Sequence, residues 1–259
     1  MNNELKNSGF SLTEVLIAVG ILSVGMVFVA GVFPAGIYLA TVATERTIAA
    51  VAADEAFAKV RIYGVGVDLS TLNVSWLKDF NGLAAAVNIN PDEFEYPSAE
   101  ANEPNQYHWS ALCRRVESEP GVVDPNLVQV TVFICRKGNP NLKYWDRNPS
   151  NTLKEIDYPV PVKVKVSQFG NPNELSIGDM DLADNIDEKI FINDGYTIVD
   201  DATGRIYRVL QRYKAPNDNT ILLDGQWGGA AAGLVWVVPP PVGGGRHACI
   251  AVYQKLIRF

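Results

Sequence analysis

The sequence predicts an α+β fold in which one long N-terminal transmembrane helix packs on an antiparallel β-sheet. Two patterns predict it. No charged side chain occurs from Val15 to Thr44, and roughly 20 apolar residues are enough for a helix to cross the hydrocarbon layer of a membrane. From Tyr107 onward, short runs of alternating apolar and polar residues are separated by Gly, Pro, Asn and Asp, which is typical of antiparallel strands.

The helix is expected to cover residues 10–63, with a membrane half at about 10–44. Beyond Thr44 the chain contains no Pro or Gly until Gly64, so nothing in the sequence ends the helix earlier. Apolar residues of this second half share one helical face, which we expect to pack on the soluble domain: Ala49, Ala53, Phe57 and Val60.

A proline lies within the membrane half of this helix. Proline lacks a backbone N–H, and its ring clashes with the preceding turn of a helix. Pro34, together with the nearby Gly31 and Gly36, is therefore expected to kink or locally melt the helix between its two halves.

The rest of the chain divides into a connecting region and a β-rich domain. Residues 64–106 are predicted to connect, with one short helix around Leu69–Val87. The β-rich domain, residues 107–259, should begin with a hairpin of Tyr107–Glu117 and Leu127–Arg136, flanking "SEPGVVDPN". Residues 169–245 are bounded by "FGNPN" and "PPPVGGG" and are predicted to form a small inserted β subdomain.

Two strands show strict alternation, which predicts which side chains face the core. In the second strand of the hairpin the inward row is Val128, Val130, Val132 and Ile134. In "VPVKVKV" the inward row is Val160, Val162, Val164 and Val166, with Lys163 and Lys165 outward.

Composition argues against several classes of function. The net charge is −7 and no basic block occurs, so no nucleic-acid partner is predicted. Three cysteines in no zinc spacing and only two histidines predict no metal site, no cofactor and no catalytic residue. His108 and His247 are expected at strand edges, without a nucleophile signature beside them. The acidic stretch "DMDLADNIDE" does not fit a calcium loop and is predicted to be a solvated turn.

The stretch "GFSLTEVLIAVGILSVG" contains one carboxylate at the start of the apolar run. A buried charge in lipid costs several kcal/mol unless it is paired. A short polar segment ends at Gly9, Phe10 follows, and Glu14 is the fifth residue from that junction. This pattern resembles the N-terminus of type IV prepilins and of the pseudopilins of type II secretion systems, and the continuation resembles their minor subunits.

The resemblance implies a pilin-like fold and a structural role without catalysis. A prepilin peptidase would remove the leader, residues 1–9, by cleaving between Gly9 and Phe10, and Phe10 would then be N-methylated. The protein would cross the inner membrane once, with its C-terminal domain in the periplasm. Its partners would be membrane lipid, an inner-membrane assembly platform and other pilin or pseudopilin subunits, in a type IV pilus or a type II secretion pseudopilus. The leader is less basic than is usual in this family, and the C-terminal cysteine pair of major pilins is missing.

The resemblance also implies a role for Glu14 in assembly. Cleavage creates a cation at the Phe10 amine, and in a stack of subunits Glu14 of one chain can pair with that amine of its neighbour. The residues themselves offer another explanation. "SLTE" is a capping box, in which Ser11 caps the helix and Glu14 reaches back to the Ser11 amide.

The cysteines allow one disulfide to be predicted, since the periplasm is oxidising. Cys113 and Cys135 lie on the two strands of the predicted hairpin, each on the face opposite its Leu/Val row. We therefore predict a cross-strand bond between them, with Cys249 free.

Two other functions are compatible with a membrane anchor followed by a β domain. One is a binding or adhesive protein that never polymerises, and the other is a membrane-tethered envelope hydrolase. Only a pilin-type protein should have a mature chain that begins at Phe10.

Overall fold

The computed structural model describes residues 11–64, 71–97, 106–119, 121–139, 141–148, 152–181 and 186–259. The chain forms two compact units, Met1–Thr47 and Ile48–Phe259. The first unit holds most of helix α1, which is Leu12–Gly64 in full, and the second unit holds the last turns of α1 and all of the strands. A long N-terminal helix followed by antiparallel sheets confirms the α+β class.

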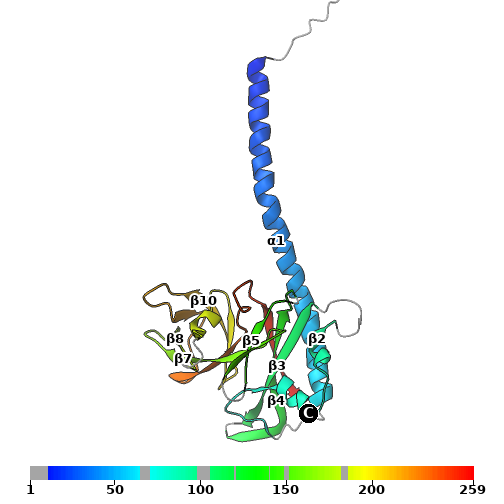
Figure 1. The fold of residues 1–259 in the computed structure, drawn as a ribbon, viewed down its shortest axis with the longest axis vertical. Helices are drawn as coiled ribbons and strands as arrows, with labels where there is room; N and C mark the ends of the chain where they lie inside the picture. Colours follow the sequence, from blue (N-terminus) through cyan, green and yellow to red (C-terminus); the bar gives the residue numbers. More distant parts are fainter. Residues whose placement is uncertain are drawn as a thin grey trace, which may run out of the picture. The chain divides into compact units, whose positions relative to one another are not determined.

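The main sheet of the second unit has the strand order β1-β3-β4-β13, and β2 also pairs with β3. Its two longest strands, β3 and β4, form the predicted hairpin (Figure 1). The hairpin turn is tighter than expected, because "VVDPN" continues β4 instead of forming a loop. All pairs are antiparallel, and the strand bounds are β1 Lys78–Asp79, β2 Glu95–Tyr96, β3 Tyr107–Glu119, β4 Val122–Arg136 and β13 Cys249–Arg258.

One face of this sheet packs against the last turns of α1. The predicted row Val128, Val130, Val132 and Ile134 is fully buried there, and Ala49, Ala53, Phe57 and Val60 of the helix are buried against it. Four of the helix residues at this contact are alanines that are almost completely buried: Ala49, Ala52, Ala53 and Ala56. Small side chains let a helix approach a sheet closely, and burying them costs little conformational entropy. Both periodicity predictions for this contact are therefore confirmed.

The other strands form a closed six-stranded barrel in the order β10-β11-β8-β7-β12-β9. Its members are β7 Val162–Gln168, β8 Glu174–Gly178, β9 Thr197–Asp200, β10 Ile206–Arg212, β11 Thr220–Leu223 and β12 Ala232–Val237. Val162, Val164 and Val166 point into its core as predicted, whereas Val160 precedes β7 and is only half-buried. A separate hairpin joins β5 Tyr144–Arg147 to β6 Leu153–Ile156.

The barrel does not begin where the sequence analysis placed the insertion. The expected range was 169–245, but β7 already belongs to the barrel, and its last strand, β12, ends at Val237. The segment from Phe169 to Asn173 is the turn between β7 and β8, which pair directly. Turn residues alone do not distinguish a domain boundary from a hairpin within one barrel.

The connecting region contains less helix than predicted. Instead of Leu69–Val87, the described residues form an α-helix, α2, only over Phe80–Ala85, capped by the Asp79 carboxylate. Residues 72–77 before it form no helix, and their backbone binds neighbouring segments: Leu77 N donates to Asp201 O, and Arg115 N donates to Asn73 O. The 3₁₀ turn η2, Pro91–Phe94, also lies in this region, and η3, Glu188–Phe191, comes before β9.

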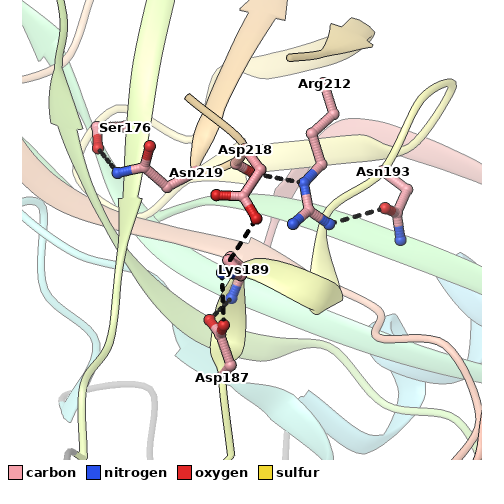
Figure 2. A network of polar contacts seen from close by, with 7 residues as sticks. All are labelled: Ser176, Asp187, Lys189, Asn193, Arg212, Asp218 and Asn219. Carbon is pink, nitrogen blue, oxygen red and sulfur yellow. Dashed lines mark hydrogen bonds and ion pairs between the residues drawn. The ribbon is translucent and has the colours of Figure 1, made fainter. Parts of the chain in front are cut away.

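A polar network on the barrel surface ties η3 to the loop before β11 (Figure 2). Lys189 Nζ lies 2.9 Å from Asp187 Oδ2 and 3.1 Å from Asp218 Oδ2. The Arg212 guanidinium donates to the Asp218 carbonyl at 2.7 Å and to Asn193 Oδ1 at 3.1 Å. Asp187 of the predicted acidic turn is thus neutralised by a lysine. Among the described residues, no group of three or more His, Cys, Asp or Glu side chains could hold a metal ion.

Candidate functional site

The described part of the first unit is a helix with an apolar surface on every side. Large apolar side chains from Leu12 to Leu39 are exposed, most of them by more than half of their surface. Among the described residues, α1 is the one helix long and apolar enough to cross a membrane, and the apolar window is not buried within the structure. A helix that is apolar all round and unburied needs an apolar environment, either lipid or other helices.

Three hydroxyl groups of this segment are satisfied within the helix itself. The hydroxyls of Ser23, Thr41 and Thr44 donate to the carbonyl four residues earlier, at 2.7–2.9 Å. Since lipid offers no hydrogen-bond partner, such internal bonds are what a membrane helix requires.

Pro34 does not interrupt the helix. The assigned helix continues through Pro34, Gly31 and Gly36, so the expected local melting is wrong. One missing N–H costs a single bond of the ladder, and the turns on both sides keep theirs. A bend at Pro34 stays a prediction.

Glu14 lies in the first turn of α1, and its carboxylate folds back on the start of the helix. Ser11 N donates to Glu14 Oε2 at 3.0 Å, and Thr13 N donates to Ser11 Oγ at 3.3 Å. These two bonds satisfy backbone donors that otherwise have no partner at a helix start, and the anion is favourable at that end of the helix. In this single chain, therefore, the Glu14 carboxylate acts as a cap while it lies at the edge of an apolar surface.

The comparison with protein families bears on this same segment. A family model described as a prokaryotic N-terminal methylation motif matches residues 5–30. The chain carries a prepilin-type methylation motif. The match supports a type IV prepilin-like protein, with a structural role, processing by a prepilin peptidase and assembly with other pilins. No curated protein and no solved structure matches the chain.

Two residues of the predicted site, Gly9 and Phe10, belong to the matched segment of this prepilin-like chain but lie outside the described residues. Glu14 is both matched and described, and it lies in the first turn of the apolar helix. The match and the exposed helix together fit a membrane-anchored pilin.

The second unit contains a cleft that the sequence analysis did not predict. It has a volume of about 600 Å³ and lies where α2 and β3 meet β5, β6 and the segment leading into β7. His108 of β3 lies in its wall and is only 3% exposed, so it is not the strand-edge residue expected from the sequence. Neither ring nitrogen of His108 has a hydrogen-bond partner among the described residues. The imidazole packs on the Tyr158 ring at a centroid distance of 4.6 Å.

Burial changes the acidity of two titratable groups at this cleft, His108 and Asp79. It lowers the pKa of His108 to about 3, because the charged imidazolium would lose its water. It raises the pKa of Asp79 to about 6, although the backbone N–H groups of Asn81 and Gly82 bind the Asp79 carboxylate. No sequence motif marks this site, because its walls come from segments far apart in the chain.

The predicted disulfide between Cys113 and Cys135 is wrong. Cys113 lies opposite Val130 and packs on the helix side of the sheet, whereas Cys135 lies opposite His108 and packs on the barrel side. The two side chains therefore point to opposite faces and sit five residues apart along β3. All three cysteines are free thiols in the structure. The error arose because Cys113 shares the face of the valine row, and the register that shows this is not visible in the sequence.

Proposed function

We propose that the chain is a structural minor pilin or minor pseudopilin, cleaved between Gly9 and Phe10 and methylated at Phe10. The observation that carries the proposal is the exposed apolar helix, which has Glu14 in its first turn and whose N-terminal part lies within the matched methylation motif. The mature subunit crosses the inner membrane once, exposes its β-rich domain to the periplasm and joins a type IV pilus or a type II secretion pseudopilus.

The helix supplies the surface for assembly, and Glu14 supplies its specificity. In an assembly the apolar side chains of α1 are covered by lipid or by neighbouring helices. Cleavage places a new amine one residue before Ser11, beside the start of the helix. The Glu14 carboxylate then leaves its capping position and pairs with the Phe10 amine of the adjacent subunit, which neutralises two charges that would be costly alone.

Processing is tested first. We expect that co-expression with a prepilin peptidase removes Met1–Gly9, so that sequencing of the mature chain starts at Phe10. A bulky residue at position 9 should block the mass change. If the intact mass never changes in the presence of an active peptidase, the proposal is wrong.

Assembly is tested by comparing two substitutions that both remove the cap. Glu14→Leu should insert and be cleaved normally, but it should lose incorporation, because the Phe10 amine of its neighbour is left buried and unpaired at a cost of about 3–5 kcal/mol. Ser11→Ala removes a capping hydroxyl, worth about 1 kcal/mol, and should assemble almost normally. Crosslinking to partner pilins in membranes measures both. Equal and mild defects would show that Glu14 is only a cap.

The cleft at His108 is the observation that favours the second candidate, an anchored binding or adhesive domain that does not polymerise. The same crosslinking experiment separates the two functions. A binding domain of this kind would remain uncrosslinked to pilins, with or without Glu14, and its chain would not begin at Phe10.

A further inference from the structure

The proposed function does not say whether a covalent bond joins β4 and β13. The register of these two strands shows where such a bond can form. In the antiparallel pair of β13 with β4, Cys249 is the direct partner of Cys135. Both side chains pack on the same apolar cluster, on the barrel side of the main sheet. Cys113, in contrast, belongs to the cluster on the opposite side.

We propose that Cys135 and Cys249 are a disulfide site. Direct partners in an antiparallel pair have Cα atoms about 4.5–5.5 Å apart, which lies within the span of about 4.4–6.8 Å that a disulfide requires. Cys249 Sγ donates to the Ala251 carbonyl at 3.7 Å, and burial, followed by the neighbouring Cys249 thiol, raises the pKa of Cys135. The irregular register beside Cys249 gives the first residues of β13 local freedom to adjust.

The difference in exposure between the two thiols sets the order of the reaction. Cys135 is fully buried, whereas Cys249 is partly exposed. The Cys249 thiolate attacks the disulfide of an oxidised dithiol protein, forms a mixed disulfide with it and releases one of its thiolates. The Cys135 thiolate then attacks Cys249 Sγ, forms the Sγ–Sγ bond and releases the second thiolate. The oxidant gains two electrons and two protons, and the two cysteines lose them.

The bond would join the end of β4 to the start of β13. We call this place, where the chain leaves and re-enters the main sheet, the neck. β4 ends at Arg136, β13 starts at Cys249, and Arg136 N donates to the Ala248 carbonyl at 2.7 Å. Residues 137–247, which include the whole barrel and the β5–β6 hairpin, start and finish at this neck. A disulfide there joins the two ends of the insertion covalently and restricts the unfolded chain over more than about 100 residues.

The bond can be tested by cutting the chain inside the closed loop. A protease site placed between Gly243 and Gly244, in an exposed turn, separates Cys135 from Cys249 along the chain. The full-length protein is exposed in detergent to an oxidised dithiol protein, treated with N-ethylmaleimide, cleaved and run on a denaturing gel. We expect the two fragments to stay joined without reductant and to separate with it.

Matched variants identify the cysteines that form the bond. Cys113→Ser should leave the fragments joined, whereas Cys249→Ser should release them. In the uncut protein, reductant should lower the melting temperature by about 10 °C for the natural sequence and for Cys113→Ser, but not for Cys249→Ser. Fragments of the natural sequence that separate without reductant would overturn the proposal. Peptide mapping that links Cys113 to either other cysteine would overturn it as well.

Discussion

At the scale of single residues, His108 makes the stability of the second unit sensitive to acid. Its pKa is about 3 in the folded protein, because of burial, and about 6.5 in an unfolded chain. The unfolded state therefore binds a proton first as the pH falls below about 6.5, and the contribution of His108 to stability is lost progressively down to about pH 3. His247, whose pKa burial lowers to about 4, acts in the same direction.

We expect the His108→Phe variant to lose less stability than the natural chain between about pH 7 and pH 5. Phenylalanine keeps the contact with Tyr158 and removes the titration, which is worth about 2 kcal/mol at pH 5. Urea unfolding of the full chain in detergent, followed by tryptophan fluorescence at both pH values, measures this. A pH dependence that is unchanged in the variant would show that His108 is not the source.

At the scale of elements, the turn between β9 and β10 joins the barrel to the main sheet. Arg114 donates from its guanidinium to Gln129 Oε1 at 2.7 Å and to the Ala202 carbonyl at 2.6 Å. Gln254 Nε2 donates to the Gly204 carbonyl at 2.8 Å. Gly204 has φ +68°, and a Cβ atom there would lie 2.5 Å from Gln129 Nε2. The turn thus needs glycine both for its backbone conformation and for its close approach.

Gly204→Ala should therefore destabilise the protein by about 1–3 kcal/mol, through backbone strain and the displacement of Gln129. Gly225→Ala is the matched control, since a Cβ there would meet no atom within 4 Å. It should change the free energy of unfolding by less than about 0.5 kcal/mol. The denaturant midpoints of the two variants measure this difference in stability. Equal midpoints would contradict the prediction.

The 3₁₀ turn η3 is held to β5 by a buried ion pair. The side chains of Arg147 and Glu188 are 5% and 0% exposed, and Arg147 Nη2 donates to Glu188 Oε1. Glu188→Ala leaves the guanidinium buried without this carboxylate and should cost about 3–5 kcal/mol. Asp218→Ala removes the exposed pair of Asp218 with Lys189 (Figure 2) and keeps the Asp218 carbonyl that Arg212 binds, so it should cost at most about 1 kcal/mol. Chemical unfolding of both variants measures the two losses of stability. Similar losses would contradict the prediction.

The sequence predicted well those features that depend on residues close together in the chain. The apolar run of α1, the alanine face and the two valine rows follow from periodicity within one element, and the structure confirms them except at Val160. The barrel boundary, the partner of each cysteine and the cleft at His108 depend on which strands pair and in which register. Val162 and Val128 lie in similar valine rows, yet they face different cores, and nothing within either strand distinguishes them.

At the scale of the whole second unit, the main sheet has a cover on both faces. The last turns of α1 pack on one face, and barrel residues such as Val199 and Trp236 pack on the other, against Leu112 and Phe133. β4 also has a strand on each side, β3 and β13. From Val128 to Cys135 every residue of β4 is buried. β4 is thus covered on both faces of the sheet and paired with a strand on each side.

Because β4 is covered on both faces and paired on both sides, its backbone amide hydrogens should exchange slowly with water. An amide exchanges through the least costly opening that exposes it. Because residues 128–134 are all buried, we expect that opening to be the unfolding of the whole unit. Amides of β5 and β6, which form only a two-stranded hairpin, should open locally. Hydrogen–deuterium exchange of the full chain should therefore find deuterium last in β4, at a rate that rises with denaturant as steeply as global unfolding does.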